Sequence, residues 1–420
     1  MVEKAKRAFR DPNTIIAMIA VLLVGVLCQS SGAENPALAY IAEEFNQLEF
    51  SSIAFVTTVP SLMMIPASLI YSFCRKKGVS FRILFVIASI LLIVGGVLPG
   101  FTPHDPNAFG FIIGWRAVFG LGVGVMWPLA QSLIVELYSG QRQNTMLGFN
   151  SVVTSVGGII WANIGGNLAL MGWRFSFFTY FVPIAVLVFC AIFLPNHRKN
   201  VAAAAEGEGL VEEKPAESEL DTAPAKSYVG MAVILIVLYF VYNFCNMTYF
   251  TNISMKVVGE GIGDSATAGL GQSMFTVGSL IIGVIFGKVM NNKFMARYSM
   301  GLGWILTGIG MVIVAQAPNF TMVAIGSVIQ GFGTGMFMPT MVGLIGNVGG
   351  KKNASVILGI STCVLGASQF FGPTIFNMIV ESMGLTAGGP CMLLTAIVHI
   401  IFAIITFIWL AIKGKDLHVA

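Results

Sequence analysis

The sequence predicts an all-α membrane protein with twelve transmembrane helices in two six-helix bundles that are related by an internal repeat. Its composition, its long apolar runs and its repeated glycine motif support this prediction. Hydrophobic residues make up 56% of the 420 residues and charged residues only 10%, against about 45–50% and about 25% in soluble proteins. A formal net charge of +4 is too small to indicate a nucleic-acid partner. The composition therefore excludes an ordinary soluble enzyme and favours a chain that crosses a lipid bilayer many times.

Twelve apolar runs are long enough to span a bilayer. A helix needs about 20 residues for this, because it rises about 1.5 Å per residue and the hydrocarbon is about 30 Å thick. The apolar residues are continuous rather than alternating, which favours helices over barrel strands. We expect the spans at 14–34, 50–73, 81–101, 109–135, 144–168, 173–195, 228–252, 265–290, 294–316, 320–346, 354–380 and 389–412.

A change of composition divides the chain into two halves. The stretch 196–227 is rich in Ala, Glu and Pro and has no aromatic residue, so we expect a solvated cytoplasmic linker. It separates an N-terminal six-helix bundle over 1–195 from a C-terminal one over 228–420. The basic start and apolar core of the first run also resemble a cleavable signal peptide. Cleavage would leave an odd number of spans, so we expect the first run to remain a span.

The positions of the cations predict the orientation. With a cytoplasmic N-terminus, the cytoplasmic segments would carry 20 of the 23 Lys and Arg residues. The positive-inside rule associates such an excess with the cytoplasmic side. We therefore expect a multi-pass protein of the cytoplasmic (inner) membrane with both termini in the cytoplasm.

Cysteine and histidine patterns give no support to disulfide or metal chemistry. Five of the six cysteines lie within or beside apolar runs, and no pair falls in a predicted extracellular loop. The sequence has no HExxH or CxxC motif and no cluster of carboxylates. We therefore expect no cofactor, no metal and no enzymatic activity. His399 stands alone on an apolar run, where a histidine is more often a hydrogen-bonded structural residue than a titrating one.

A glycine motif occurs once in each half. The pattern GxGxGxxxP runs from Gly120 to Pro128 in span 4 and from Gly331 to Pro339 in span 10, an offset of 211 residues. The same offset pairs Asn35 with Asn246 and Gly148 with Gly359. Agreement at one offset across three spans predicts two similar bundles. Glycines at alternate positions let neighbouring helix backbones approach closely, and the proline weakens the helix locally.

With these features the chain resembles the major facilitator superfamily over essentially its whole length. The span 4 segment GWRAVFGLGVGVMWP looks like the family's motif of an intramembrane arginine, here Arg116, followed by spaced glycines. The segment GWRFSFF from Gly172 looks like the family's usual start of span 6. The arrangement of six spans, a long central loop and six more spans completes the resemblance.

Three positions depart from the family's pattern. The loop motif after span 2 normally contains an aspartate, but Arg75 stands near its place in SFCRKKGVSFR. Asn291 occupies the acidic position of the corresponding loop after span 8. The Gly-Pro signature of antiporters is missing from span 5, where Trp161 and Ala162 stand, although span 11 contains Gly372 and Pro373. These departures weaken an assignment to the proton-coupled drug exporters.

Arg116 is the one strongly charged residue that the sequence places well inside a span. An ionisable residue there costs several kcal/mol unless it is paired or hydrated, so it indicates a function. On a helix it shares a face with Gly120, Val123 and Trp127. This face would give an aqueous pathway a cation that attracts an anion or controls a nearby carboxyl group. The alternative is a structural arginine that binds backbone carbonyls at a helix break.

Glu34 ends the predicted span 1 and lies near enough to Arg116 to pair with it. A carboxylate that is paired in one conformation and in an apolar site in another suits proton coupling. The alternative is that Glu34 faces water.

Polar side chains follow one side of span 7 and its counterparts. Tyr239, Tyr242, Asn243 and Asn246 line one side of a helix, and the 211 offset gives Ser31 and Asn35 on the matching face of span 1. Such groups should face a cavity or another helix, because lipid leaves them unsatisfied. We expect the substrate or ion pathway to be formed by Arg116, Trp127, Ser31, Asn35, Tyr239, Tyr242, Asn243, Asn246, Gln272, Gln330 and Thr334, with Glu34 for proton coupling. The alternative for each residue is contact between helices.

The sequence thus predicts a secondary transporter that works by alternating access. Arg116 favours a small organic anion as the substrate, carried by ion symport or exchange. The alternatives are a proton-coupled exporter of amphipathic drugs and, from other classes, a passive channel or a membrane-embedded enzyme. The expected partners are a small-molecule solute, protons or another coupling ion, and lipid; we expect no nucleic acid and a monomeric protein.

Overall fold

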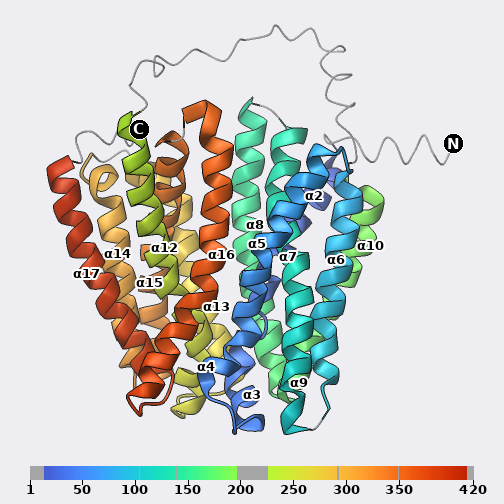
Figure 1. The fold of residues 1–420 in the computed structure, drawn as a ribbon, viewed down its shortest axis with the longest axis vertical. Helices are drawn as coiled ribbons and strands as arrows, with labels where there is room; N and C mark the ends of the chain where they lie inside the picture. Colours follow the sequence, from blue (N-terminus) through green and yellow to red (C-terminus); the bar gives the residue numbers. More distant parts are fainter. Residues whose placement is uncertain are drawn as a thin grey trace, which may run out of the picture.

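The computed structural model describes residues 14–103, 105–138, 140–195, 226–290, 293–348 and 350–413, and every regular element in them is helical. Twelve helical segments in this part of the chain are long and apolar enough to cross a membrane, which confirms the predicted number of spans. Figure 1 shows the helices of the two halves gathered into two bundles that lie side by side. The predicted linker over 196–227 lies almost wholly outside the described residues, as do the basic N-terminal tail and the last residues of the chain.

The N-terminal bundle contains the first six spans. Its elements are α2 (Ile15–Cys28), η1 (Gln29–Gly32), η2 (Asn35–Ala37), α3 (Leu38–Glu44), α4 (Phe50–Ile53), α5 (Phe55–Lys76), α6 (Phe81–Val97), η3 (Leu98–Phe101), η4 (Pro106–Ala108), α7 (Phe109–Leu137), α8 (Gly140–Ala169), α9 (Trp173–Phe177), η5 (Phe178–Phe181) and α10 (Val182–Phe193).

The C-terminal bundle contains the other six spans, and its helices are mostly uninterrupted. They are α12 (Lys226–Ser254) with the π-helical turn η6 (Met255–Gly259), α13 (Ser265–Met290), α14 (Lys293–Ala315), α15 (Phe320–Val348), α16 (Gly350–Ser382) and α17 (Gly389–Lys413).

The first span differs from its predicted bounds. It continues to Glu44 instead of ending at residue 34, because α2 is followed by the short 3-10 turns η1 and η2 and then by α3. Pro36 has no backbone N–H to continue an α-helical ladder, which accounts for the interruption at this point. Glu34 therefore lies inside the first span and not at its end.

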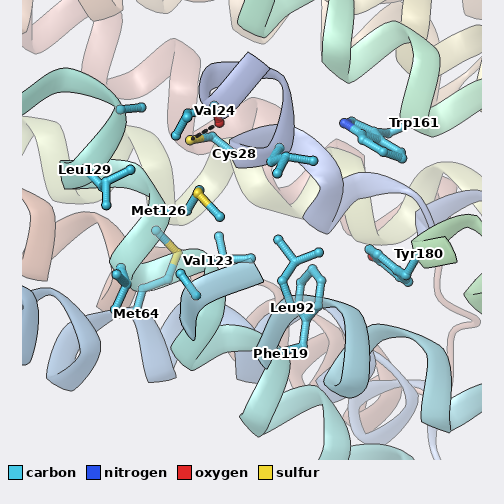
Figure 2. Close-up of a cluster of buried hydrophobic side chains, with 14 of the residues drawn as sticks. Val24, Cys28, Met64, Leu92, Phe119, Val123, Met126, Leu129, Trp161 and Tyr180 are labelled. Atoms are coloured by element: carbon cyan, nitrogen blue, oxygen red, sulfur yellow. Dashed lines mark hydrogen bonds between the residues drawn. The ribbon is translucent and has the colours of Figure 1, made fainter. Parts of the chain in front are cut away.

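The glycine motif of α7 brings three helices into close contact. A Cβ atom on Gly120 would lie 2.5 Å from the Pro60 carbonyl oxygen of α5, and one on Gly122 would lie 2.7 Å from the Ala88 carbonyl oxygen of α6. The intervening residues fill the bundle core, where Val123 is fully buried. Figure 2 shows this core, with Phe119, Val123 and Met126 of α7 surrounded by side chains of neighbouring helices.

The C-terminal motif repeats this packing helix for helix. Gly331 and Gly335 of α15 face α13, the counterpart of α5, and Gly333 faces α14, the counterpart of α6. A Cβ atom on Gly335 would lie 2.7 Å from the Ser279 carbonyl oxygen. The internal repeat that the 211-residue offset predicts is therefore present in the packing of the helices as well as in the sequence.

Hydrogen bonds join the two bundles on the side opposite the described chain ends. Because the number of spans is even, α2 begins and α17 ends on the same side, the top of Figure 1. On the other side, Ser254 at the end of α12 donates to the Pro36 carbonyl (2.7 Å), and Ser265 at the start of α13 donates to the Gly166 carbonyl (2.7 Å). The carboxylate of Glu381, near the end of α16, accepts a hydrogen bond of 2.7 Å from the backbone N–H of Ser51 in α4.

Candidate functional site

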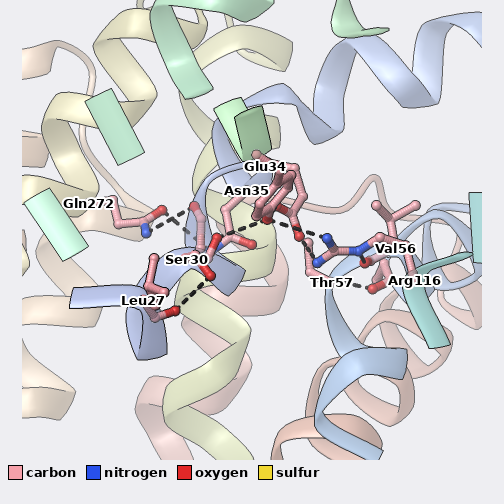
Figure 3. Close-up of polar contacts among 11 residues, drawn as sticks. Leu27, Ser30, Glu34, Asn35, Val56, Thr57, Arg116 and Gln272 are labelled. Atoms are coloured by element: carbon pink, nitrogen blue, oxygen red, sulfur yellow. Dashed lines mark hydrogen bonds and ion pairs between the residues drawn. The ribbon is translucent and has the colours of Figure 1, made fainter. Parts of the chain in front are cut away.

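A buried ion pair lies inside the N-terminal bundle. The guanidinium of Arg116 on α7 is paired with the carboxylate of Glu34, and both side chains are completely buried. The same carboxylate accepts a hydrogen bond from the hydroxyl of Tyr180, which comes from the sixth span. Arg116 also donates through Nε to the Val56 carbonyl of α5 (2.7 Å). Figure 3 shows Arg116 between Glu34 and Val56, so four spans meet at one charged cluster.

Small and aromatic neighbours make room for this cluster and cover it. Gly96 of α6 has no side chain where a Cβ atom would collide with the ring of Tyr180. The guanidinium carbon of Arg116 lies 4.1 Å from the ring centroid of Phe119, a cation–π geometry. The Phe119 and Tyr180 rings pack edge to face with centroids 4.8 Å apart. The pair therefore lies in an environment of low polarity, where electrostatic interactions are strong.

The two alternatives that the sequence left open for Arg116 both describe part of this geometry. The arginine binds a backbone carbonyl, as a structural arginine would, and it also neutralises a carboxylate. The gaps at Gly120 and Gly124 are filled by the backbone of α5, so this face of α7 is a helix–helix contact. Trp127, further along the face, is partly buried and packs against the bundle core. The alternative that Glu34 faces water does not describe this structure.

The ion pair has no counterpart in the second half of the chain. At the 211-residue offset, Glu34 corresponds to Cys245 and Arg116 corresponds to Ser327. Ser327 instead exchanges a hydrogen bond of 2.8 Å with Tyr249. The two bundles share their packing but not their charges.

Two amide pairs involve the first helix of each bundle. Asn35 donates to the side-chain oxygen of Gln272 on α13 (3.4 Å), so this pair joins the two bundles. Asn246 on α12 accepts from Gln330 on α15 (3.1 Å), within the C-terminal bundle. Asn35 and Asn246 are the two asparagines that the sequence repeat matched, and each is now found in a contact with another amide.

The other polar residues that follow one side of span 7 lie mostly inside the C-terminal bundle. The hydroxyl of Tyr242 is hydrogen-bonded to Thr307 (2.7 Å) and to Thr334 (2.9 Å), and its ring stacks on Phe337. Asn243 donates to the carbonyl of Tyr239 on the same helix (2.8 Å). These contacts fit the alternative interpretation of these residues, in which they pack against other helix residues and do not line a pathway. Ser31 is partly buried at the junction of α2 and the 3-10 turns.

His399 lies in the aromatic core of the same bundle. It is fully buried beside Trp304 and Tyr242, and its Nδ1 atom is 2.9 Å from the Thr395 carbonyl oxygen. This contact supports the interpretation of His399 as a structural residue.

Two polar contacts were not predicted from the sequence. Tyr180 reaches Glu34 across 146 positions of sequence, and no local pattern indicates such a contact. Lys256, which lies beyond the predicted end of the seventh span at residue 252, is buried at the end of this span, where it pairs with Glu260 and donates to the Ala315 carbonyl. The i, i+4 spacing of Lys256 and Glu260 was the available signal for their pairing.

In the part of the chain that the structure describes, fold and site together define a membrane protein with twelve candidate spans and an ion pair buried in one of two repeated bundles. The profile of the Major Facilitator Superfamily matches residues 20–262 and 235–418. The chain belongs to the Major Facilitator Superfamily. This membership confirms the resemblance seen in the sequence and agrees with the expectation that the protein is not an enzyme.

Individual relatives are distant. The chain is 26% identical over 196 residues to the uncharacterized MFS-type transporter YcnB of Bacillus subtilis (strain 168), which covers 44% of this chain and 39% of that protein. It is 25% identical over 227 residues to the probable polyol transporter 6 of Arabidopsis thaliana, covering 52% and 44%. The matched regions thus span less than half the length of either relative.

Solved structures share the fold over nearly the whole chain. A D-xylose-proton symporter superposes with a TM-score of 0.71 at 17% identity, covering 93% of this chain and 97% of that one. A bacterial homologue of the human lysosomal transporter Spinster, in an inward-facing and unoccupied conformation, superposes with a TM-score of 0.66 at 14% identity, covering 96% and 97%. At these identities the likeness shows the fold alone.

Proposed function

We propose that this protein is a secondary active transporter that moves a small organic solute across the cytoplasmic membrane by alternating access, with protons as the coupling ion. The observation that carries this proposal is the completely buried pair of Glu34 and Arg116, which connects the first and fourth spans. The sequence has no ATP-binding motif, so an ion gradient is the energy source that fits.

The ion pair offers two states that differ by one proton. With Glu34 ionised, the charges compensate each other and the carboxylate also holds Tyr180. With Glu34 protonated, Arg116 is a buried cation without a counter-charge, a situation that is strongly unfavourable in an apolar site. The helices that contribute to the cluster are then free to adopt another arrangement. A proton can therefore bias the relative stability of the two orientations of the bundles.

The substrate charge that the site favours depends on whether Glu34 carries this proton. An organic anion, the substrate that the sequence favoured, finds no free cation while Glu34 is ionised. It would be attracted only when Glu34 is protonated, and this makes proton symport the form of the anion hypothesis that is consistent with the geometry.

Proton-coupled export of amphipathic drugs remains a second candidate. The chain is 22% identical over 186 residues to the multidrug transporter protein MdtP of Bacillus subtilis (strain 168), a match that covers 44% of the chain and 32% of that protein.

We also propose that the chain ends are cytoplasmic and that the protein is a monomer. Under this orientation, the hydrogen bonds from Ser254, Ser265 and Ser51 hold the bundles together on the outer side.

Proton coupling can be tested without knowing the substrate. Proteoliposomes on a solid-supported membrane should give a transient charge movement after a pH jump, because Glu34 gains or loses a proton inside the protein. We expect the Glu34→Gln variant to lose this signal. Glu43→Gln is the matched control, since Glu43 is an exposed glutamate at the end of the same span. Loss of the signal in both variants, or in neither, would show that Glu34 is not the coupling carboxylate.

A further inference from the structure

We propose that Asn35 and Gln272 form the polar part of the substrate site and that the substrate is a neutral solute rich in hydroxyl groups. This inference rests on the proposed transport function and specifies its substrate class. The two amides come from the first span and from α13, so a ligand bound to them touches both bundles, as a substrate in alternating access must. Figure 3 shows Asn35 and Gln272 facing each other beside the ion pair.

The orientation of the two amides follows from one backbone group. The side-chain nitrogen of Gln272 donates to the Gly32 carbonyl (3.3 Å), which can only accept. The oxygen of Gln272 is therefore the atom that faces Asn35, and Asn35 must present its own nitrogen to it. As a consequence, the side-chain oxygen of Asn35 points away from the pair.

This oxygen is a buried acceptor without a donor. The Asn35 side chain is 2% exposed, and its Oδ1 atom has no hydrogen-bond partner among the described residues. The Oε1 atom of Gln330, in the other amide pair, is in the same situation. A buried amide oxygen left without a donor destabilises the protein, so such atoms call for a partner. Here a hydrogen-bond donor on a ligand would satisfy them.

While Glu34 is ionised, the charges near Asn35 disfavour ligands that carry a charge. Glu34, the adjacent residue, is compensated by Arg116, and Lys256 is paired with Glu260. In this state an anionic ligand would meet no free cation at these positions, and its carboxylate or phosphate oxygens would face the acceptor oxygen of Asn35. A protonated amine could donate to Asn35 but would find no free carboxylate beside it. A hydroxyl group can donate to the open Asn35 oxygen without carrying a charge, which fits this site.

The hypothesis can be tested by titration calorimetry with three ligands that share one carbon skeleton. Sorbitol, gluconate and glucamine are six-carbon chains that end in a hydroxyl, a carboxylate and an ammonium group at neutral pH, and xylitol and glycerol extend the neutral series. Purified full-length protein should bind at least one neutral polyol saturably, and bind gluconate and glucamine more weakly. Saturable heat separates binding from the general stabilisation that polyols give to proteins by exclusion from their surface.

Variants of both amides locate the binding. Asn35→Ala should weaken polyol binding by about tenfold, because it removes the acceptor of a hydrogen bond that is shielded from water. Gln272→Ala should also weaken binding, because it removes the amide that orients Asn35. They lie in different bundles, so one remains informative if the other fails to fold. Asn167→Ala is the matched control, because Asn167 is an exposed amide that binds the Asn163 carbonyl of its own helix.

Three results would overturn the inference. They are binding of gluconate or glucamine at least as tight as that of the neutral polyols, no binding of any neutral polyol, and polyol binding that Asn35→Ala leaves unchanged. The pH-jump experiment is independent of these results. If polyols bind through Asn35 but the charge movement does not depend on Glu34, the proposed substrate site is supported and proton coupling through Glu34 is rejected. The opposite outcome leaves the coupling and removes the substrate class.

Discussion

Removal of the charge on Glu34 should destabilise the protein far more than the small change in volume suggests. Glu34→Gln keeps the size of the side chain and an oxygen that can accept from Arg116, but it leaves the completely buried guanidinium without a negative charge to compensate it. Loss of one partner of a buried ion pair typically costs about 3–5 kcal/mol. The equilibrium constant of unfolding should therefore rise by a factor of about 100 to several thousand.

A double-mutant cycle separates the ion pair from other effects. Arg116→Met should also destabilise the protein, because it leaves the carboxylate alone, whereas the combined variant should recover most of the loss since an apolar replacement has no charge to compensate. The measurement is SDS-driven unfolding in mixed micelles at pH 7.5, followed by tryptophan fluorescence. We expect a coupling energy of about 2 kcal/mol or more. If the two single losses simply add, to within about 0.5 kcal/mol, the pair does not hold the cluster together and the reasoning fails.

Further predictions concern packing, capping and the contact between the bundles. Gly122→Ala should cost about 1–3 kcal/mol in the same unfolding assay, because its Cβ would collide with the α6 backbone, whereas Gly110→Ala should be close to neutral since its Cβ would meet no atom within 4 Å. Asp264 caps α13, and hydrogen bonds from Thr267 lower the pKa of its carboxyl group. The part of its contribution that depends on the negative charge should therefore be fully present above pH about 4 and be lost as the pH falls through that lowered pKa. Asp264→Ala should cost about 0.5–2 kcal/mol at pH 7 and less once the carboxyl is protonated, because a neutral carboxyl is the weaker acceptor, and an equal effect at both pH values would contradict this. Glu381→Ala removes the carboxylate that binds the first turn of α4, so spin labels on α4 and on the end of α16 should give a longer or broader distance distribution in pulsed EPR. An unchanged distribution would show that this bond does not hold the bundles together.

The fold could be predicted from the sequence because its main signals are local. Twelve apolar runs predict the helices. The 211-residue spacing of Gly120 and Gly331 predicts the repeat, because only glycine lets two helix backbones approach as closely as they do at these positions. The end of the first span was predicted wrongly, because hydropathy shows where apolar residues stop but not that the chain continues helically beyond Pro36. That error placed Glu34 at the surface of the membrane.

The site was less accessible to sequence reasoning. The pairing of Glu34 with Arg116 could be suggested, since two opposite charges in a membrane seek each other. The third partner could not, because Tyr180 reaches them only through the space left by Gly96, a relation between distant segments. The repeat offset brought Asn35 and Asn246 to attention, but their amide partners on α13 and α15 follow from tertiary packing alone.

The serine contacts between the two halves have a consequence for how the chain tolerates change. At Ser254 and Ser265 the donor is a side chain of the second half, whereas the acceptor in the first half is the main-chain carbonyl of Pro36 or Gly166. A main-chain carbonyl remains after almost any substitution at its own position. For these two contacts, only the serines of the second half therefore need to be kept. A chimaera that keeps the second half and takes its first half from a distant relative would retain both acceptors, while the reverse exchange would lose both donors unless serines happened to stand there.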